Sequence, residues 1–402
     1  MSVKRMIQTF AVVLSTALSA AAGNDQPAEP DNGLPTVHVE MAIQAESYSG
    51  GDSTYAFGFA RLAETGFTIR EAKAIIEGNY ENYLEYNLEF GSASCLDGGF
   101  MVIEAGLMLN LSSDWKAGIT KGHVLRGFEM YDECVQLLTA EKPVFAKKFS
   151  PCHPLGFAVE FDKDLGEHSG IFTQLVIAEG SGGTLDDEHD INLGIHYRTP
   201  LPGLTLAAGY DFWRWNAPYN TKDSIPTPGG ARDDYTVFWT EHKQIYDGHR
   251  AIAGLRYNDH NLELQGEVFL GKGFKDALDI PYYADIWADS SSTAKTVGAP
   301  FEDLEMNAVM VQAGYSLPLE SERFTYLQPY VQYQWWDQAA NLEGDYRSSF
   351  LTVGINVGLG PGDARFKMDY QTCLGFANDG GLPGYGEDQQ ADRLLIRLQV
   401  GI

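Results

Sequence analysis

The sequence is poor in basic residues and in long apolar runs. Among its 402 residues are 28 Lys and Arg against 55 Asp and Glu, which gives a formal net charge of −27. Such a charge opposes nucleic-acid binding, because the phosphates would be repelled. No apolar run reaches the roughly 18 residues of a membrane-spanning helix, which excludes a helical membrane protein. A hydrophobic fraction of 44% in turn excludes a chain that is disordered throughout.

Cysteine is also scarce, and no catalytic or metal-binding spacing is visible. None of Cys95, Cys134, Cys152 and Cys373 has Cys-x-x-Cys spacing or a histidine cluster beside it, so neither a metal nor a cofactor is expected. Cys134 and Cys152 bracket one long loop and are the first candidates for a disulfide, although three pairings, or four free thiols, stay open. The histidines are scattered and none lies in a Gly-x-Ser-x-Gly elbow, so an enzyme is not expected.

The first residues have the pattern of a signal peptide. Lys4 and Arg5 precede a short apolar stretch over 10–22, which ends in three alanines before Gly23. A membrane anchor is the alternative, but this apolar stretch is too short to span a bilayer. The sequence therefore predicts a signal peptide over 1–22 and a flexible, proline-rich lead-in over 23–35.

From residue 36 onward, apolar and polar residues alternate in many short segments. The clearest are VHVEMAIQAE (37–46), NLELQGEVFL (261–270), LTVGINVGL (351–359) and LLIRLQVGI (394–402). A period of two indicates strands with one apolar and one polar face, not helices. Sixteen strands are predicted to start near Val37, Phe67, Tyr83, Phe100, Asp114, Leu155, Gly170, Ile191, Leu204, Arg250, Asn261, Asn307, Phe324, Ser349, Arg365 and Ala391. The tenth of these is poorly bounded.

Short and long connections alternate between these strands. Short links are predicted at 81–83, 110–114, 199–203, 258–261 and 360–363, with less regular ones at 163–170 and 316–323. The longest links are predicted at 49–66, 126–154, 214–249, 271–302 and 377–390. In total, seven short turns and eight longer loops are expected.

Together these patterns predict an all-β fold: a single 16-stranded antiparallel transmembrane β-barrel over 36–402, with short periplasmic turns and long extracellular loops. Lipid offers no hydrogen bonds, so such a sheet must close on itself, and the strand ending at Ile402 should pair with the strand that begins near Val37. The expected location is the outer membrane of a Gram-negative bacterium, among lipid and lipopolysaccharide, after handling by the outer-membrane assembly machinery. Aromatic residues at strand ends would ring both interfaces: Trp115, Tyr197, Tyr210, Phe212, Tyr257, Tyr315, Tyr333, Trp335, Phe366 and Tyr370. A secreted β-sandwich or β-solenoid is the alternative.

A barrel of sixteen strands leaves an aqueous channel that something must narrow. The loop over 126–154 is the candidate to fold inward, and its charged residues are Glu129, Asp132, Glu133, Lys142, Lys147 and Lys148. The alternative is a solvated loop that stays outside.

Alternate residues of a strand point to opposite faces of the sheet, so the polar positions of each predicted strand identify the charged residues of the inner wall. The basic positions are Lys73, Lys116, Arg198, Arg256, Arg365, Lys367, Arg393 and Arg397. The acidic positions are Glu40, Glu85, Glu89, Glu160, Asp190, Asp211, Glu263, Glu267 and Asp369. Arg365, Lys367, Arg393 and Arg397 fall on the last two strands, where they could form a basic patch that sets ion preference. Alternatively, acids and bases pair across strands and only solvate the wall.

Residues 67–162 resemble the phosphate-selective porin O/P family. The resemblance lies in a charged second strand with Glu71 and Lys73, in Tyr86 and Leu88 on the third, in Gly118 and Lys121 before the long loop, in Glu129 early in that loop, and in Leu155, Gly156 and Val159 after it. It implies a homotrimeric sixteen-stranded outer-membrane porin. Residues 123–127 replace the family's usual Pro-Phe-Gly loop opening, and basic wall positions are few and mixed with more acids. Outer-membrane barrels usually end in Phe, and Ile402 departs from that pattern as well.

The expected function is therefore passive diffusion of ions and small hydrophilic solutes, with weak selectivity or a preference for cations. One alternative is a pore specific for anionic solutes such as phosphate. Another is a surface-binding or adhesion barrel that uses long loops rich in Trp, with Trp213, Trp215, Trp239 and Trp287 as contacts.

Overall fold

Antiparallel strands make up nearly all of the structure. The computed structural model describes residues 35–49, 65–80, 83–93, 100–131, 137–140, 143, 154–179, 189–226, 235–272, 305–337, 340–341, 347–360, 364–377 and 392–401. Across these residues, no helix has the length and apolar character needed to cross a membrane.

Over the described residues, the sheet contains seventeen strands. The first nine are β1 (Thr36–Ser49), β2 (Thr65–Tyr80), β3 (Leu84–Ala93), β4 (Phe100–Asn110), β5 (Trp115–Lys121), β6 (Leu155–Asp164), β7 (Gly170–Glu179), β8 (His189–Arg198) and β9 (Leu204–Pro226). The others are β10 (Tyr235–Asp259), β11 (Leu262–Lys272), β12 (Glu305–Tyr315), β13 (Leu317–Pro318), β14 (Phe324–Asp337), β15 (Arg347–Leu359), β16 (Ala364–Phe376) and β17 (Asp392–Gly401). One short helix, α2 (Phe128–Tyr131), follows β5.

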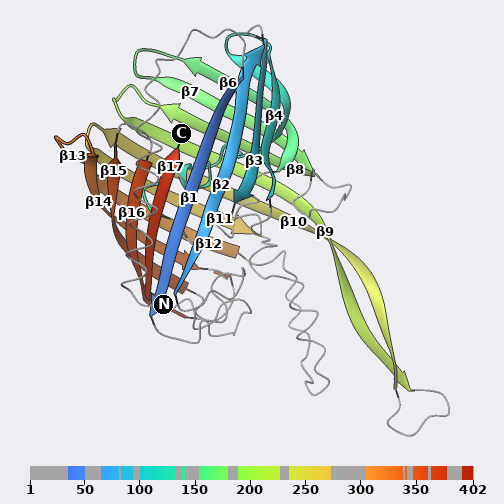
Figure 1. The fold of residues 1–402 in the computed structure, drawn as a ribbon. Helices are drawn as coiled ribbons and strands as arrows, with labels where there is room; N and C mark the ends of the chain where they lie inside the picture. Colours follow the sequence, from blue (N-terminus) through green and yellow to red (C-terminus); the bar gives the residue numbers. More distant parts are fainter. Residues whose placement is uncertain are drawn as a thin grey trace.

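Each strand pairs antiparallel with its neighbour along the chain, and the two ends of the chain also meet. β1 pairs with β2 on one edge and with β17 on the other, where Met41 lies opposite Val400. Figure 1 shows β1 and β17 side by side. The predicted pairing of the first strand with the last is therefore confirmed, and it explains why alternation continues to the end of the sequence.

Fifteen of the sixteen predicted strand starts lie within two residues of the observed ones. The prediction differs from the structure in two places. β13 adds a two-residue pairing with β14 inside the predicted turn at 316–323, so the sheet has one strand more than predicted. The second difference is the predicted loop at 214–249, which was wrong. β9 continues to Pro226, β10 begins at Tyr235, and these two residues face each other across the ladder.

The physical reason for this error is visible in Figure 1, where the paired ends of β9 and β10 project beyond the other strands. The two strands hydrogen-bond to each other along their full length. Where a ribbon projects beyond the sheet, the sheet no longer requires apolar and polar residues to alternate along it. The sequence over 214–249 consequently lacks the period of two that marks the other strands.

Burial along the strands is the reverse of that in a soluble protein. On β12, Val311 is 48% exposed and its neighbour Gln312 only 5%, and on β14 Val331 is 41% exposed and Gln332 only 1%. Lys367 on β16 is fully buried. Large apolar side chains normally avoid water and charged ones are rarely buried. One face of the sheet is therefore apolar and open, and the other is polar and enclosed.

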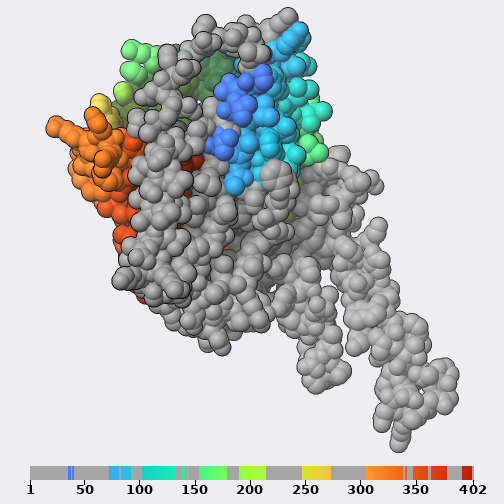
Figure 2. All heavy atoms as spheres, viewed as in Figure 1, coloured from blue at the N-terminus to red at the C-terminus, as the bar shows by residue number. Residues whose placement is uncertain are grey.

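The open face also carries five of the ten expected aromatic residues: Trp115, Tyr210, Tyr315, Tyr333 and Tyr370 are exposed. The other five, Tyr197, Phe212, Tyr257, Trp335 and Phe366, are half-buried. The space-filling view in Figure 2 shows the first strands, coloured blue to cyan, on one side of the molecule and residues 305–350, in orange, on the other. The exposed Trp and Tyr rings suit the boundary between lipid and water, as predicted for such a surface.

The open apolar face leads to a test at Val331, which lies mid-way along β14. If this face meets lipid, Val331→Arg should lower the free energy of unfolding from phospholipid vesicles by about 2–4 kcal/mol. Guanidinium titration would measure the change. Glu322→Arg, in the exposed turn before β14, is the matched control and should alter stability little. Equal effects of the two substitutions would mean that the face does not contact lipid.

Candidate functional site

A segment that follows β5 lies against the polar face of the sheet. We call residues 122–131 and 137–140 the docked segment. It begins where His123 Nδ1 lies 2.9 Å from the carbonyl oxygen of Tyr131, a contact that closes the turn around α2. The N–H of His123 donates to Glu104 Oε1 of β4 at 3.3 Å. Further along, the segment makes hydrogen bonds with residues of β7, β8, β9, β11, β12, β15 and β16. It thus joins strands that are far apart in the order of the sheet.

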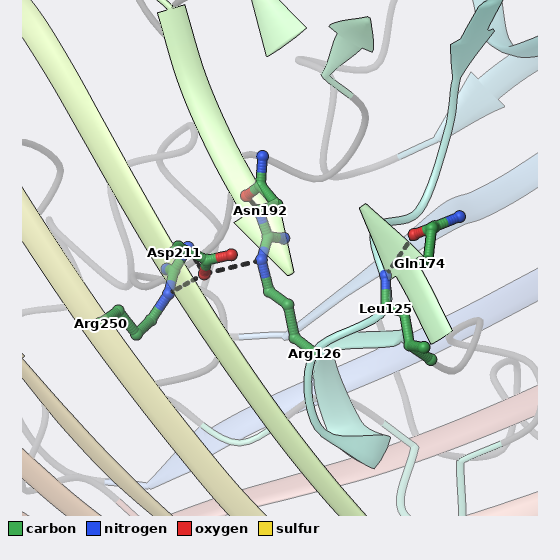
Figure 3. Close-up of polar contacts among 6 residues, drawn as sticks. All are labelled: Leu125, Arg126, Gln174, Asn192, Asp211 and Arg250. Carbon is green, nitrogen blue, oxygen red and sulfur yellow. Dashed lines mark hydrogen bonds and ion pairs between the residues drawn. The ribbon is translucent and has the colours of Figure 1, made fainter. Parts of the chain in front are cut away.

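The first anchor is a buried arginine. Arg126 donates from Nε to Asp211 Oδ2 of β9 at 2.9 Å and from Nη2 to Asn192 Oδ1 of β8 at 2.8 Å. Arg250 of β10 donates to the same Asp211 oxygen at 2.5 Å. Figure 3 shows the two arginines reaching the shared carboxylate from opposite sides. Arg126, Asp211 and Arg250 are each at most 3% exposed, so breaking this network would leave a charge buried without its partner.

Beside this anchor, the backbone of the docked segment comes very close to the sheet. The N–H of Leu125 donates to Gln174 Oε1 of β7 at 2.8 Å (Figure 3). A Cβ on Gly194 of β8 would lie 2.0 Å from the carbonyl oxygen of Leu125. Only glycine permits so close an approach. Val124 adds apolar contact with Ala158 and neighbouring small residues of β6 and β7.

Two buried carboxylates hold helix α2. Oε1 of Glu267, on β11, accepts hydrogen bonds from the N–H groups of Phe128 and Glu129. These first-turn donors have no partner within a helix, so an acceptor at this position satisfies them. Glu129 in turn accepts from Gln265 Nε2 and Gln312 Nε2, both at 3.0 Å. Both carboxylates are 1% exposed.

The amide chain continues along the wall. Gln332 donates to Gln312 at 2.9 Å, and Gln334 donates to Gln332 at 2.5 Å. On the other side of α2, the guanidinium of Arg256 lies 4.3 Å from the centroid of the Phe128 ring and donates to Gln265 at 2.8 Å. Each polar group therefore orients the next, which fixes Glu129 in place.

The second anchor lies on β15 and β16. Lys367 donates to the carbonyl oxygens of Leu137 and Thr139, the latter at 3.3 Å. The N–H of Ala140 donates to Asp369 Oδ2 at 2.6 Å, and Asn356 Nδ2 donates to Leu138 O at 2.9 Å. The backbone of the docked segment is thus held by side chains of the wall.

Some of the charged residues assigned to the wall pair with each other. Lys73 and Glu89 lie 3.3 Å apart on β2 and β3, with both side chains 6% exposed. Lys116 and Glu85 lie 2.7 Å apart, with about a third of each side chain exposed. These contacts match the alternative in which acids and bases pair across strands.

The basic residues predicted to gather on the last two strands do lie together. Lys367 on β16 faces Arg397 on β17, and both are fully buried. Arg393 is 7% exposed, and Arg365 borders a cavity. The remaining candidates lie outside the described residues: Asp132, Glu133, Lys142, Lys147, Lys148, Cys134 and Cys152. Cys373 is a free thiol.

Several residues of the site were not found from the sequence. Gln174, Asn192, Gln265, Gln312 and Asn356 lie at inward-facing positions of their strands, so the alternation would have identified them had uncharged polar residues been included. Arg250 was missed because the predicted strand began only there, whereas β10 begins at Tyr235. Arg126 gave no such signal, because it lies outside any strand. Its partner Asp211 is 85 residues away in the sequence.

Two cavities adjoin these contacts. One has a volume of about 300 Å³ and is bordered by the docked segment and by β10–β16. The other, of about 610 Å³, lies near the short turns that join β4 to β5 and β6 to β7. Among the described residues, no cluster of three or more His, Cys, Asp or Glu residues could hold a metal ion.

Solved structures with similar folds are outer-membrane proteins. The anion-selective porin from Comamonas acidovorans has a TM-score of 0.55 at 12% identity, and the match covers 92% of this chain and 100% of that one. OmpT of Vibrio cholerae in its trimer form has a TM-score of 0.53 at 11% identity, covering 92% and 100%. The outer membrane channel DcaP of Acinetobacter baumannii has a TM-score of 0.50 at 11% identity, covering 92% and 97%.

No protein-family profile and no curated protein sequence matches the chain. At these low identities the structural likeness shows the fold. It is the antiparallel all-β fold of outer-membrane porins and channels.

The Arg126 anchor can be tested through Asp211. Asp211→Asn removes the charge shared by two buried arginines, and such a loss typically costs about 3–5 kcal/mol. Amide hydrogen exchange at residues 125–129 should therefore accelerate by about 100-fold or more. Asp164→Asn is the control, because Asp164 pairs with Arg198 at 2.6 Å on an exposed surface. Unchanged protection in the Asp211 variant would show that this network does not hold the segment.

Proposed function

We propose that the chain is an outer-membrane porin of a Gram-negative bacterium, through which ions and small hydrophilic solutes diffuse passively. The observation that carries the proposal is that apolar side chains are exposed and polar ones buried along the strands. In addition, the first strand pairs with the last. An apolar outer face suits lipid, and a polar enclosed face suits a wet interior. The structural likeness to porins supports the fold on which this function would rest.

In this proposal the sheet closes into a barrel with sixteen positions around its wall. The strand pairings run from β1 along the chain to β17, and β17 pairs with β1 again. β12 and β13 both pair with β14, so together they fill one position. Closure satisfies the backbone hydrogen bonds that lipid cannot satisfy. Residues 1–22 would be removed as a signal peptide, 23–35 would lead into the barrel, and 36–402 would form it.

Within such a barrel the docked segment would be the constriction. One of its anchors lies on β8–β10 and the other on β15–β16, so the segment would cross the interior rather than follow the wall. Its contacts are charged or amide groups that are buried against the polar face. This arrangement supports the expectation that the loop after β5 folds inward and narrows the pore.

The charges around the docked segment favour weak ion selectivity. Asp211 is shared by Arg126 and Arg250, and Glu129 borders the same cavity as Arg256. Pores acquire strong ion selectivity from rings of side chains that carry charges of one sign. Mixed, paired charges argue for a general pore and against a ladder that selects phosphate. A homotrimer, contact with lipopolysaccharide and insertion by the assembly machinery are parts of the same proposal.

Planar-bilayer recording tests the pore directly. The purified protein should give stepwise, stable conductance in potassium chloride, and its reversal potential in a salt gradient should lie close to zero. Swelling of liposomes in small sugars should accompany the conductance. A protein that inserts but carries no steady current would refute the porin, and a strong anion preference would refute weak selectivity.

A second prediction concerns the constriction. Gly194→Ala places a Cβ 2.0 Å from the carbonyl oxygen of Leu125, so the docked segment must move away from β8. We expect the single-channel conductance to rise or to become unstable. Gly266→Ala on β11 is the matched control, because its Cβ would meet nothing closer than 3.7 Å. Identical conductance in both variants would mean that the segment does not limit the current.

A further inference from the structure

The cavity of about 300 Å³ beside the docked segment has the size of a small-molecule site. Its wall is mostly polar and comes from β10, β11, β12, β14, β15 and β16, with Glu129, Leu137 and Leu138 of the docked segment and Ser316 also bordering it. Polar groups at defined positions fix the orientation of a ligand.

One side of the cavity offers a guanidinium. Arg365 borders the cavity and makes no hydrogen bond or ion pair with any described residue. Arg256, nearby, is held in place by the Phe128 ring and by Gln265. A guanidinium presents a planar fork of donors that fits a carboxylate with two parallel hydrogen bonds.

The other side offers acceptors. Asn356 is 3% exposed, and its Nδ2 donates to Leu138 O and to Gln328 Oε1. Its Oδ1 is buried and has no partner among the described residues. A buried acceptor without a donor is unfavourable, which points to a ligand that donates to it. Glu263 adds a carboxylate, which the amide of Gln328 contacts at 3.5 Å.

The charges that line the cavity balance. Two guanidinium groups, of Arg256 and Arg365, face two carboxylates, of Glu129 and Glu263. A dianion such as phosphate would meet both carboxylates, and a diamine would meet both guanidinium groups. A neutral molecule with separated charges avoids either repulsion.

We infer that this cavity binds a small zwitterion of the α-amino acid type, with its carboxylate on Arg365 and its ammonium group near Asn356 Oδ1 and Glu263. The inference rests on the proposed porin function, because the solute would reach the cavity through the interior. It makes the pore a general channel with a weak binding site for zwitterions.

Isothermal titration calorimetry of the purified protein in detergent tests the inference. L-Glutamine should bind saturably, whereas succinate, putrescine and xylose should not. Arg365→Gln and Glu263→Gln should each weaken glutamine binding by about tenfold, as expected for loss of a hydrogen bond to a charged group. Arg323→Gln, which removes an exposed arginine from the turn before β14, is the matched control and should bind normally.

Three results would overturn the inference. Xylose or succinate could bind as well as glutamine, Arg365→Gln could bind like the control, or glutamine could give no binding because Asn356 Oδ1 is satisfied by water alone. Bilayer conductance separates the two proposals. Normal current without glutamine binding would refute the zwitterion site alone, whereas absence of current would refute the porin. Retained heat-resistant mobility in gel electrophoresis would show that each variant is folded.

Discussion

The structure depends on one constraint: every strand must find hydrogen-bond partners for both of its edges. An open sheet leaves two rows of unpaired backbone groups, which water can satisfy and lipid cannot. Pairing of β1 with both β2 and β17 removes this problem at the ends of the chain. Once the backbone is satisfied, the outer side chains need no polar partners. This allows the large apolar side chains that are exposed along the strands.

The side chains of the enclosed polar face determine how the docked segment is held. A segment that packs on an apolar core is stabilised by the apolar surface area that it buries. The docked segment instead contacts mainly carboxylates, amides and guanidinium groups. Its attachment is therefore directional, through Arg126 at one anchor and Lys367 at the other. Directional contacts made out of water are strong when complete and costly when one partner is missing. Such a segment can hold one position against the polar face of the sheet.

Most of the fold could be predicted from the sequence because alternation reports directly on which face of a strand is apolar. The beginnings of β4, β6 and β9 followed from this pattern alone. Prediction failed for the distal part of β9 and β10, which pair with each other and project beyond the other strands, so the sheet imposes no alternation there.

The site was harder to predict, because it depends on relations across the sheet. The alternation placed Asp211 and Glu267 on the inner face. Nothing in the sequence joined Asp211 to Arg126 or Glu267 to the first turn of α2. The need for glycine at 194 likewise exists only because the carbonyl oxygen of Leu125 comes to rest against it.

The described contacts of the docked segment are unevenly distributed around the wall. They reach β4, where the N–H of His123 donates to Glu104 Oε1 at 3.3 Å, as well as β7–β9, β11, β12, β15 and β16. The wall at β2, β3 and β5 carries the pairs Lys73–Glu89 and Lys116–Glu85. In the proposed barrel, a solute would pass these paired charges. Charges that are already paired exert little net field on a passing ion, so the passage would discriminate by size more than by sign.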